Sequence, residues 1–219
     1  MPNWSTNRIT MYENYELDST DFYKNKEGKH AITDIYEKFL KDITVERKEG
    51  EDYYNLMEIM PTPEILERVH ASSPPYLIRD RETGEFLKQS IDTPELGEER
   101  EAFYKTNTHP KFEKVEIVEG TDIYNELWEK YGCLSWYDWN VKNWGTKWEI
   151  TLEKSEISFD EYNLQFYCDS AWCPPEGLLQ HIADTYNVNV ECFYEIEGYG
   201  NDGVGKDTYE PASALEVEV

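Results

Sequence analysis

The sequence is short of cysteine and of long apolar runs, and both shortages limit what the protein can be. Its 219 residues include only Cys133, Cys168, Cys173 and Cys192, and no two of them form a CxxC pair. Neither a disulfide framework nor a structural zinc site is therefore indicated. No apolar run approaches the length that crosses a bilayer, and the N-terminus lacks a basic segment followed by an apolar one. We expect a cytoplasmic protein with reduced thiols and no membrane partner.

Basic residues are also scarce, with 21 lysines and arginines against 46 aspartates and glutamates and a net charge of −25. Such a charge field repels phosphate, so direct binding to nucleic acid and adsorption to anionic membranes are disfavoured. Two explanations stay open: a solvated surface that promotes solubility, or an acidic patch that occupies a basic groove on another protein. The tightest acidic group would lie largely on one side of a helix. These candidate partner-binding residues are Glu95, Glu98, Glu99 and Glu101.

Sequence motifs of the common enzyme classes are missing, since the chain contains no GxGxxG, Walker, HExxH or GxSxG pattern. Cys173 and His181 lie on or near one predicted helix, but nothing orients them as a nucleophile and its base. Residues 201–207 lack the alternating ligands of a calcium loop. The sequence therefore predicts no catalytic residue, no cofactor and no metal site.

Apolar periodicity predicts an α+β protein. Apolar side chains recur at helical spacing in residues 32–40, 123–131 and 175–186. Period-two or continuous apolar patterns predict strands in residues 7–12, 53–60, 146–154, 162–168 and 188–196.

Proline, glycine and charged residues set the predicted boundaries. Residues 61–120 carry few regular apolar patterns and are interpreted as a large irregular insertion. The rest of the domain would comprise residues 1–60 and 121–198. Residues 199–219 look like an acidic, flexible tail.

Four tryptophans follow the predicted insertion within a short stretch: Trp136, Trp139, Trp144 and Trp148. Together they can bury several hundred square ångströms, and Gly145 permits a close backbone approach or a positive φ. We interpret them as a corner that closes the core. A platform for nucleobases is the first alternative, but only Lys142 and Lys147 lie near enough in sequence to supply a basic groove. A partly exposed protein interface is the second.

Several short motifs carry a family resemblance. Met1-Pro2-Asn3-Trp4 followed by Asn7-Arg8, Trp136-Tyr137-Asp138-Trp139 and the segments 143–148 and 171–175 resemble the YubB-like proteins of bacteriophages and plasmids. The resemblance implies a ferredoxin-like antiparallel sheet, with the helices at 32–40 and 175–186 on one face. The serine usual in the Trp-Ser-Pro-Pro motif is Cys173 here. The motif residues expected to be structural are Trp136, Trp139, Trp144, Gly145, Trp148, Trp172, Pro174 and Pro175.

The resemblance implies no particular reaction. Small acidic proteins of mobile elements often act on host machinery, so the leading hypothesis is a non-enzymatic modulator or inhibitor. Its partner would be a host or immune-defence protein, one that itself binds nucleic acid if the acidic surface imitates that ligand. The alternatives are an assembly accessory that forms a homo-oligomer, and an undescribed enzyme.

Overall fold

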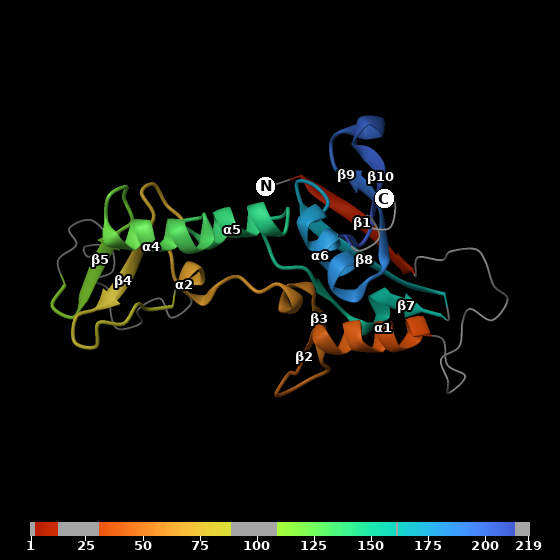
Figure 1. The fold of residues 1–219 in the computed structure, drawn as a ribbon, viewed down its shortest axis with the longest axis horizontal. Coiled ribbons are helices and arrows are strands. Elements are labelled where there is room, and N and C mark those ends of the chain that lie inside the picture. The colour runs from red at the N-terminus through yellow and green to blue at the C-terminus, as the bar shows by residue number, and fades with distance from the viewer. Residues whose placement is uncertain (1–2, 13–30, 89–108, 161, 213–219) are drawn as a thin grey trace. The chain divides into compact units, whose positions relative to one another are not determined.

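The computed structural model describes residues 3–12, 31–88, 109–160 and 162–212 (Figure 1). Contacts divide the chain into two compact units. The sheet unit comprises Met1–Pro61 and Lys142–Val219, and the insertion unit comprises Thr62–Val141.

The sheet unit is built on a five-stranded antiparallel sheet in the order β10-β9-β1-β8-β7. Its strands are β1 (Trp4–Tyr12), β7 (Ile157–Phe159), β8 (Asn163–Ala171), β9 (Asn189–Ile196) and β10 (Val204–Tyr209). Helix α1 (Ala31–Asp42) follows β1, and helix α6 (Glu176–Tyr186) connects β8 to β9. Without β10, the order β9-β1-β8-β7 places the first and third strands at the centre, as in a ferredoxin-like domain. The predicted α+β class and ferredoxin-like sheet are confirmed.

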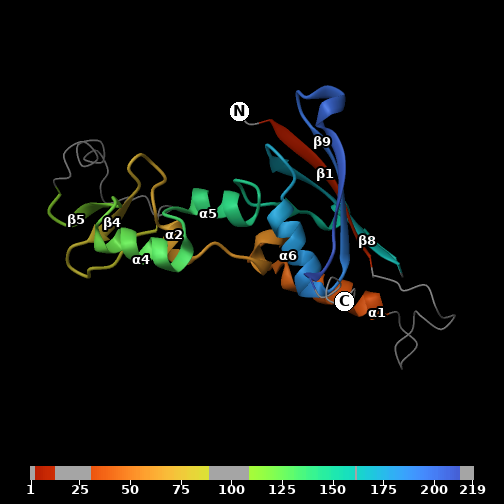
Figure 2. The same cartoon turned by 45° about the horizontal axis from the view of Figure 1, so that its top comes forward.

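One face of this sheet is buried under α1 and α6 (Figure 2). Phe39 of α1 stacks on Phe166 of β8 with ring centroids 6.2 Å apart and meets Tyr186 of α6 edge to face. The Tyr36 hydroxyl donates to the Met11 carbonyl at 2.8 Å, which ties α1 to the end of β1. Because alternate side chains of a strand point to opposite faces, this packing leaves the other face of the sheet to solvent.

A second sheet has three short strands, and two of them are shorter than the sequence predicts. It contains β2 (Thr44–Val45), β3 (Tyr53–Asn55) and β6 (Thr151–Leu152). The strand predicted for residues 53–60 ends at Asn55. The Asn55 side chain accepts a hydrogen bond from the Met57 amide and so caps a short 3₁₀ helix, η1 (Leu56–Ile59), which replaces the rest of the predicted strand. The strand predicted for 146–154 is reduced to β6, and the 3₁₀ helix η3 (Lys154–Glu156) follows it.

The insertion unit is more regular and ends later than predicted. It contains α2 (Glu64–Glu67), a two-stranded sheet of β4 (Tyr76–Asp80) and β5 (Phe112–Glu116), α4 (Asp122–Tyr131) and most of α5 (Trp136–Asn143). The predicted boundary at residue 120 is wrong because Leu127 of α4 packs in one buried cluster with Leu66, Leu77 and Ile117. Helix α4 therefore belongs to this unit and not to the ferredoxin-like domain.

The predicted flexible tail also needs correction within its described part. A 3₁₀ helix, η4 (Gly200–Gly203), leads into β10, which pairs with β9 along its whole length. None of the helices in the described ranges combines the length and the apolar character that a membrane span requires.

Candidate functional site

Residues 3–4, 143–148 and 171–175, which carry part of the family resemblance, meet at one end of the five-stranded sheet. Trp144 is only 2% exposed, and its indole nitrogen donates to the Met60 carbonyl at 2.8 Å. Gly145 has a φ of +82°, and a Cβ atom there would lie 2.9 Å from the Glu176 amide nitrogen. The start of α6 therefore packs against backbone at this position, and the predicted close approach at Gly145 is confirmed.

Residues 171–175 are joined to the same corner by hydrogen bonds. The Ala171 amide donates to the buried Thr146 hydroxyl at 3.0 Å, and the Trp172 amide donates to the Asn3 carbonyl at 2.8 Å. Trp172 has a φ of +75°, a conformation that is strained for a residue with a side chain. Pro174 and Pro175 are buried at the start of α6.

Three other tryptophan rings of this corner are partly exposed. Trp4 and Trp148 lie with ring centroids 5.5 Å apart, and the Lys147 ammonium sits 4.6 Å from the Trp148 centroid and 5.9 Å from that of Trp172. Trp148 is 37% exposed, so the prediction that it belongs to the core is wrong. Its ring packs on the indole of Trp4, which is itself exposed.

The predicted corner of four tryptophans is likewise divided. Trp136 and Trp139 are half-buried on α5 in the insertion unit, where Trp139 packs against the cluster around Leu127. Trp139 therefore contributes to the core of the insertion unit, whereas Trp144 is buried in the sheet unit.

The outer face of the sheet presents a row of aromatic and cationic side chains. In the strand register, Arg8 of β1 lies between Tyr167 of β8 and Phe193 of β9. Lys206 of β10 lies next in the same row, beside Phe193. Tyr167 is 50% exposed and Phe193 is 40% exposed. The Arg8 guanidinium lies 5.2 Å from the Phe193 centroid, so it turns toward β9 and leaves Tyr167 open.

The neighbouring rows carry carboxylates. Thr6 lies between Asp169 of β8 and Glu195 of β9, and its hydroxyl donates to Asp169 at 2.9 Å. On the other side of the aromatic row, Glu191 forms an ion pair with Lys206 at 2.7 Å. Within the described residues, Asp169 and Glu195 have no ion-pair partner.

A depression of about 380 Å³ opens beside Tyr167. Its lining includes the acidic residues Glu149, Glu156 and Asp169, together with Thr6 and Tyr167. It lies where the short strand β7 no longer covers β8, since β7 pairs only with residues 164–166.

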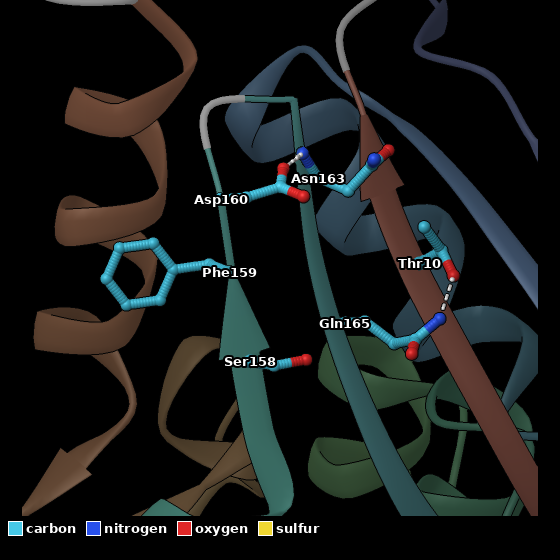
Figure 3. A pocket seen from close by; sticks show the side chains of 6 residues that line it. All are labelled: Thr10, Ser158, Phe159, Asp160, Asn163 and Gln165. Atoms are coloured by element: carbon cyan, nitrogen blue, oxygen red, sulfur yellow. Dashed lines mark hydrogen bonds between the residues drawn. The ribbon is translucent and has the colours of Figure 1, made fainter.

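A second depression, of about 290 Å³, lies further along β8 (Figure 3). The Gln165 amide donates to the Thr10 hydroxyl at 3.2 Å across the sheet, and Asp160 accepts from the Asn163 amide at 2.8 Å. The Phe159 ring points away from these polar groups. The two depressions thus flank Tyr167 along one strand.

The thiols are engaged in packing. Burial raises the pKa of the Cys192 thiol to about 12 and raises that of Cys168 further, while burial also raises the pKa of Cys173. Cys173 donates to the Gly145 carbonyl at 3.3 Å, and His181 contacts the Ile59 carbonyl at 3.1 Å. The structure therefore gives Cys173 and His181 separate partners, and a raised pKa keeps a thiol in its less nucleophilic form.

The structure also bears on the residues considered as metal ligands or as an acidic patch. In the part of the chain that the structure describes, no three histidine, cysteine, aspartate or glutamate side chains gather as metal ligands. Residues 201–207 form the end of η4 and the start of β10. Glu95, Glu98, Glu99 and Glu101 lie outside the described residues.

Sequence reasoning missed the outer face as a site. The alternation of Arg8 and Thr10 against Ile9 and Met11 did indicate two faces of β1. It could not indicate that Tyr167 and Phe193 lie on either side of Arg8, because that row depends on strand pairing across more than 150 residues of chain.

Comparison with known proteins supports the fold. No curated protein and no solved structure matches the chain. Residues 143–218 match a protein family described as the ferredoxin-like domain in Api92-like protein. The match begins beside Lys142, where the chain returns to the sheet unit, and it includes β8, α6, β9 and β10. This part of the chain, together with β1 and α1, forms a ferredoxin-like domain.

Proposed function

We propose that the protein works by binding another protein, and that it docks through the outer face of the ferredoxin-like sheet. The observation that carries this proposal is the row of Tyr167, Arg8 and Phe193, in which two large rings are exposed on either side of a cation. Aromatic residues and arginine are enriched in protein interfaces and supply much of their binding energy. The exposed pair of Trp4 and Trp148 adds aromatic surface at the same end of the sheet as Asp169.

Charge favours a protein over a nucleic acid as the ligand of this face. Exposed aromatic rings on a ferredoxin-like sheet are also how some domains stack nucleobases. Such binding needs cations along the phosphate backbone, whereas here Asp169 and Glu195 flank the row and the chain carries a net charge of −25.

The resemblance to YubB-like proteins extends the proposal to a biological setting. The gene would belong to a phage, prophage or plasmid, and the partner would be a cytoplasmic protein of the bacterial host or of its immune system. Binding would modulate or inhibit that partner without a chemical reaction.

Affinity capture from a bacterial host lysate, read by mass spectrometry, tests the proposal. The wild type is compared with the double variant Tyr167→Ala and Phe193→Ala, whose side chains are exposed and tolerate truncation. Trp128→Ala is the matched control, because Trp128 is an exposed aromatic residue of the insertion unit. A partner captured by the wild type and the control, but lost by the double variant, supports the outer face. Capture that survives the double variant contradicts it, and recovery of the chain alone favours self-assembly.

A further inference from the structure

The charge around Tyr167 is unbalanced. Glu149, Glu156 and Asp169 line the depression beside its ring, and Glu195 stands in the adjacent row. None of these four carboxylates has an ion-pair partner among the described residues. Arg8, which is paired with Tyr167 in the strand register, is turned onto the Phe193 ring of β9.

Resting on the proposed function, we infer that the depression beside Tyr167 receives an arginine side chain from a basic, extended segment of the partner protein. A guanidinium can stack its plane on an aromatic ring while its N–H groups donate to carboxylates, and Tyr167 and Asp169 offer both contacts. Thr6 already holds Asp169 through a 2.9 Å hydrogen bond, so little ordering of this acceptor is needed on binding.

The second depression indicates the direction of the bound segment. Its polar lining includes Gln165 and Asp160, and Gln165 precedes Asp169 on the same face of β8. Four residues of strand separate them by about 13 Å, at about 3.3 Å per residue. An extended peptide that runs beside β8 therefore reaches both depressions with side chains about four residues apart.

The same charges make a polyanion an unfavourable ligand for this depression. A phosphate chain laid along β8 would pass Glu149, Glu156 and Asp169, whose negative charges would repel it. A basic segment, in contrast, gains from these carboxylates and from the attraction of a chain with a net charge of −25.

Fluorescence anisotropy with the full chain tests the inference. The probe is a short fluorescein-labelled peptide in which arginine alternates with serine, and the control peptide carries neutral citrulline in place of arginine. The variant Glu149→Gln, Glu156→Gln and Asp169→Asn removes the charges of the depression. A matched control, Glu37→Gln, Glu46→Gln and Glu49→Gln, removes the same charge from exposed positions elsewhere in the sheet unit.

We expect the arginine probe to bind and the citrulline peptide to fail. The depression variant and Tyr167→Ala should each weaken binding about tenfold or more, equivalent to about 1.4 kcal/mol, whereas the matched control should stay within about twofold of the wild type. Absence of arginine-probe binding, or equal affinity of the two triple variants, overturns the inference. So does Tyr167-dependent binding of a fluorescein-labelled single-stranded oligouridylate.

The outcomes separate this inference from the proposed function. If the arginine probe fails while the Tyr167 and Phe193 double variant still loses its captured partner, the outer face remains the docking surface and only its ligand chemistry is wrong. If the double variant also captures the partner as well as the wild type does, both the inference and the proposed docking surface are wrong.

Discussion

The indole rings of Trp4 and Trp148 lie 5.5 Å apart and are inclined by 34°, which joins the first strand of the sheet to the segment that follows the insertion unit. Both rings are more than a third exposed, whereas Trp144, four residues before Trp148, is buried. Two tryptophans of one short motif therefore have different roles.

This difference predicts unequal losses of stability. Trp144→Ala should lower the free energy of unfolding by about 3 to 5 kcal/mol, because it removes a large buried ring and its hydrogen bond to Met60. Trp148→Ala should cost less than about 2 kcal/mol, since its ring is partly solvated. Urea denaturation of both variants measures the two losses, and equal losses would contradict the assignment of Trp148 to the surface.

Gly145 should tolerate no side chain. Gly145→Ala introduces a Cβ atom 2.9 Å from the Glu176 amide nitrogen at a φ of +82°. Gly50→Ala is the matched control, because Gly50 has a φ of +98° but nothing within 4 Å of its added Cβ. Both variants bear the cost of a positive φ, of about 1 kcal/mol, and Gly145→Ala should lose about 1 to 3 kcal/mol more through the clash. Denaturation midpoints that fall equally would show that α6 can move away.

Alkaline pH should destabilise the protein. Burial raises the pKa of Cys192 from 9.0 to about 12, so the folded state holds its proton more tightly than the unfolded state. The stability that this thiol contributes is complete below pH 9 and is lost as the pH rises toward about 12. Urea midpoints across this window should fall less in Cys192→Ala than in the wild type. An identical pH profile of the two proteins would exclude a contribution from Cys192.

The four glutamates of the acidic group stay a prediction from sequence. Changing Glu95, Glu98, Glu99 and Glu101 to glutamine should leave the melting temperature near that of the wild type. If these carboxylates imitate nucleic acid, binding of the captured partner should weaken more than about tenfold at low salt, or about 1.4 kcal/mol. Competing duplex DNA should displace the wild-type protein from this partner, and the affinity between the two proteins should fall steeply as the salt concentration rises. Unchanged affinity without competition or salt dependence would leave the aromatic face as the contact.

Much of the fold was predictable where one segment carries its own periodicity. Ile9 and Met11 alternate with polar residues and lie in β1, while Tyr36 and Phe39 share the buried side of α1. In both elements the pattern within a few residues reflects burial against a single surface.

Other elements depend on partners distant in the chain. The glycine-rich start of β10 looks like a loop in sequence, yet this strand is held by pairing with β9, and the Tyr194 ring occupies the space that a side chain at Gly205 would need. Helix α4 was predicted correctly but assigned to the wrong unit, because the contacts of Leu127 with Leu66 and Leu77 leave no trace in local periodicity.

The sequence by itself determined the α+β class, the main helices and the strongly acidic character, since periodicity and charge are properties of short segments and of composition. Only the tertiary structure decided which aromatic side chains reach solvent. Tyr167 and Phe193 stand on either side of Arg8 because β8 and β9 pair with opposite edges of β1. Trp144 is buried because Met60 and the start of α6 cover it, and such covering by residues from elsewhere in the chain has no signature in the motif itself.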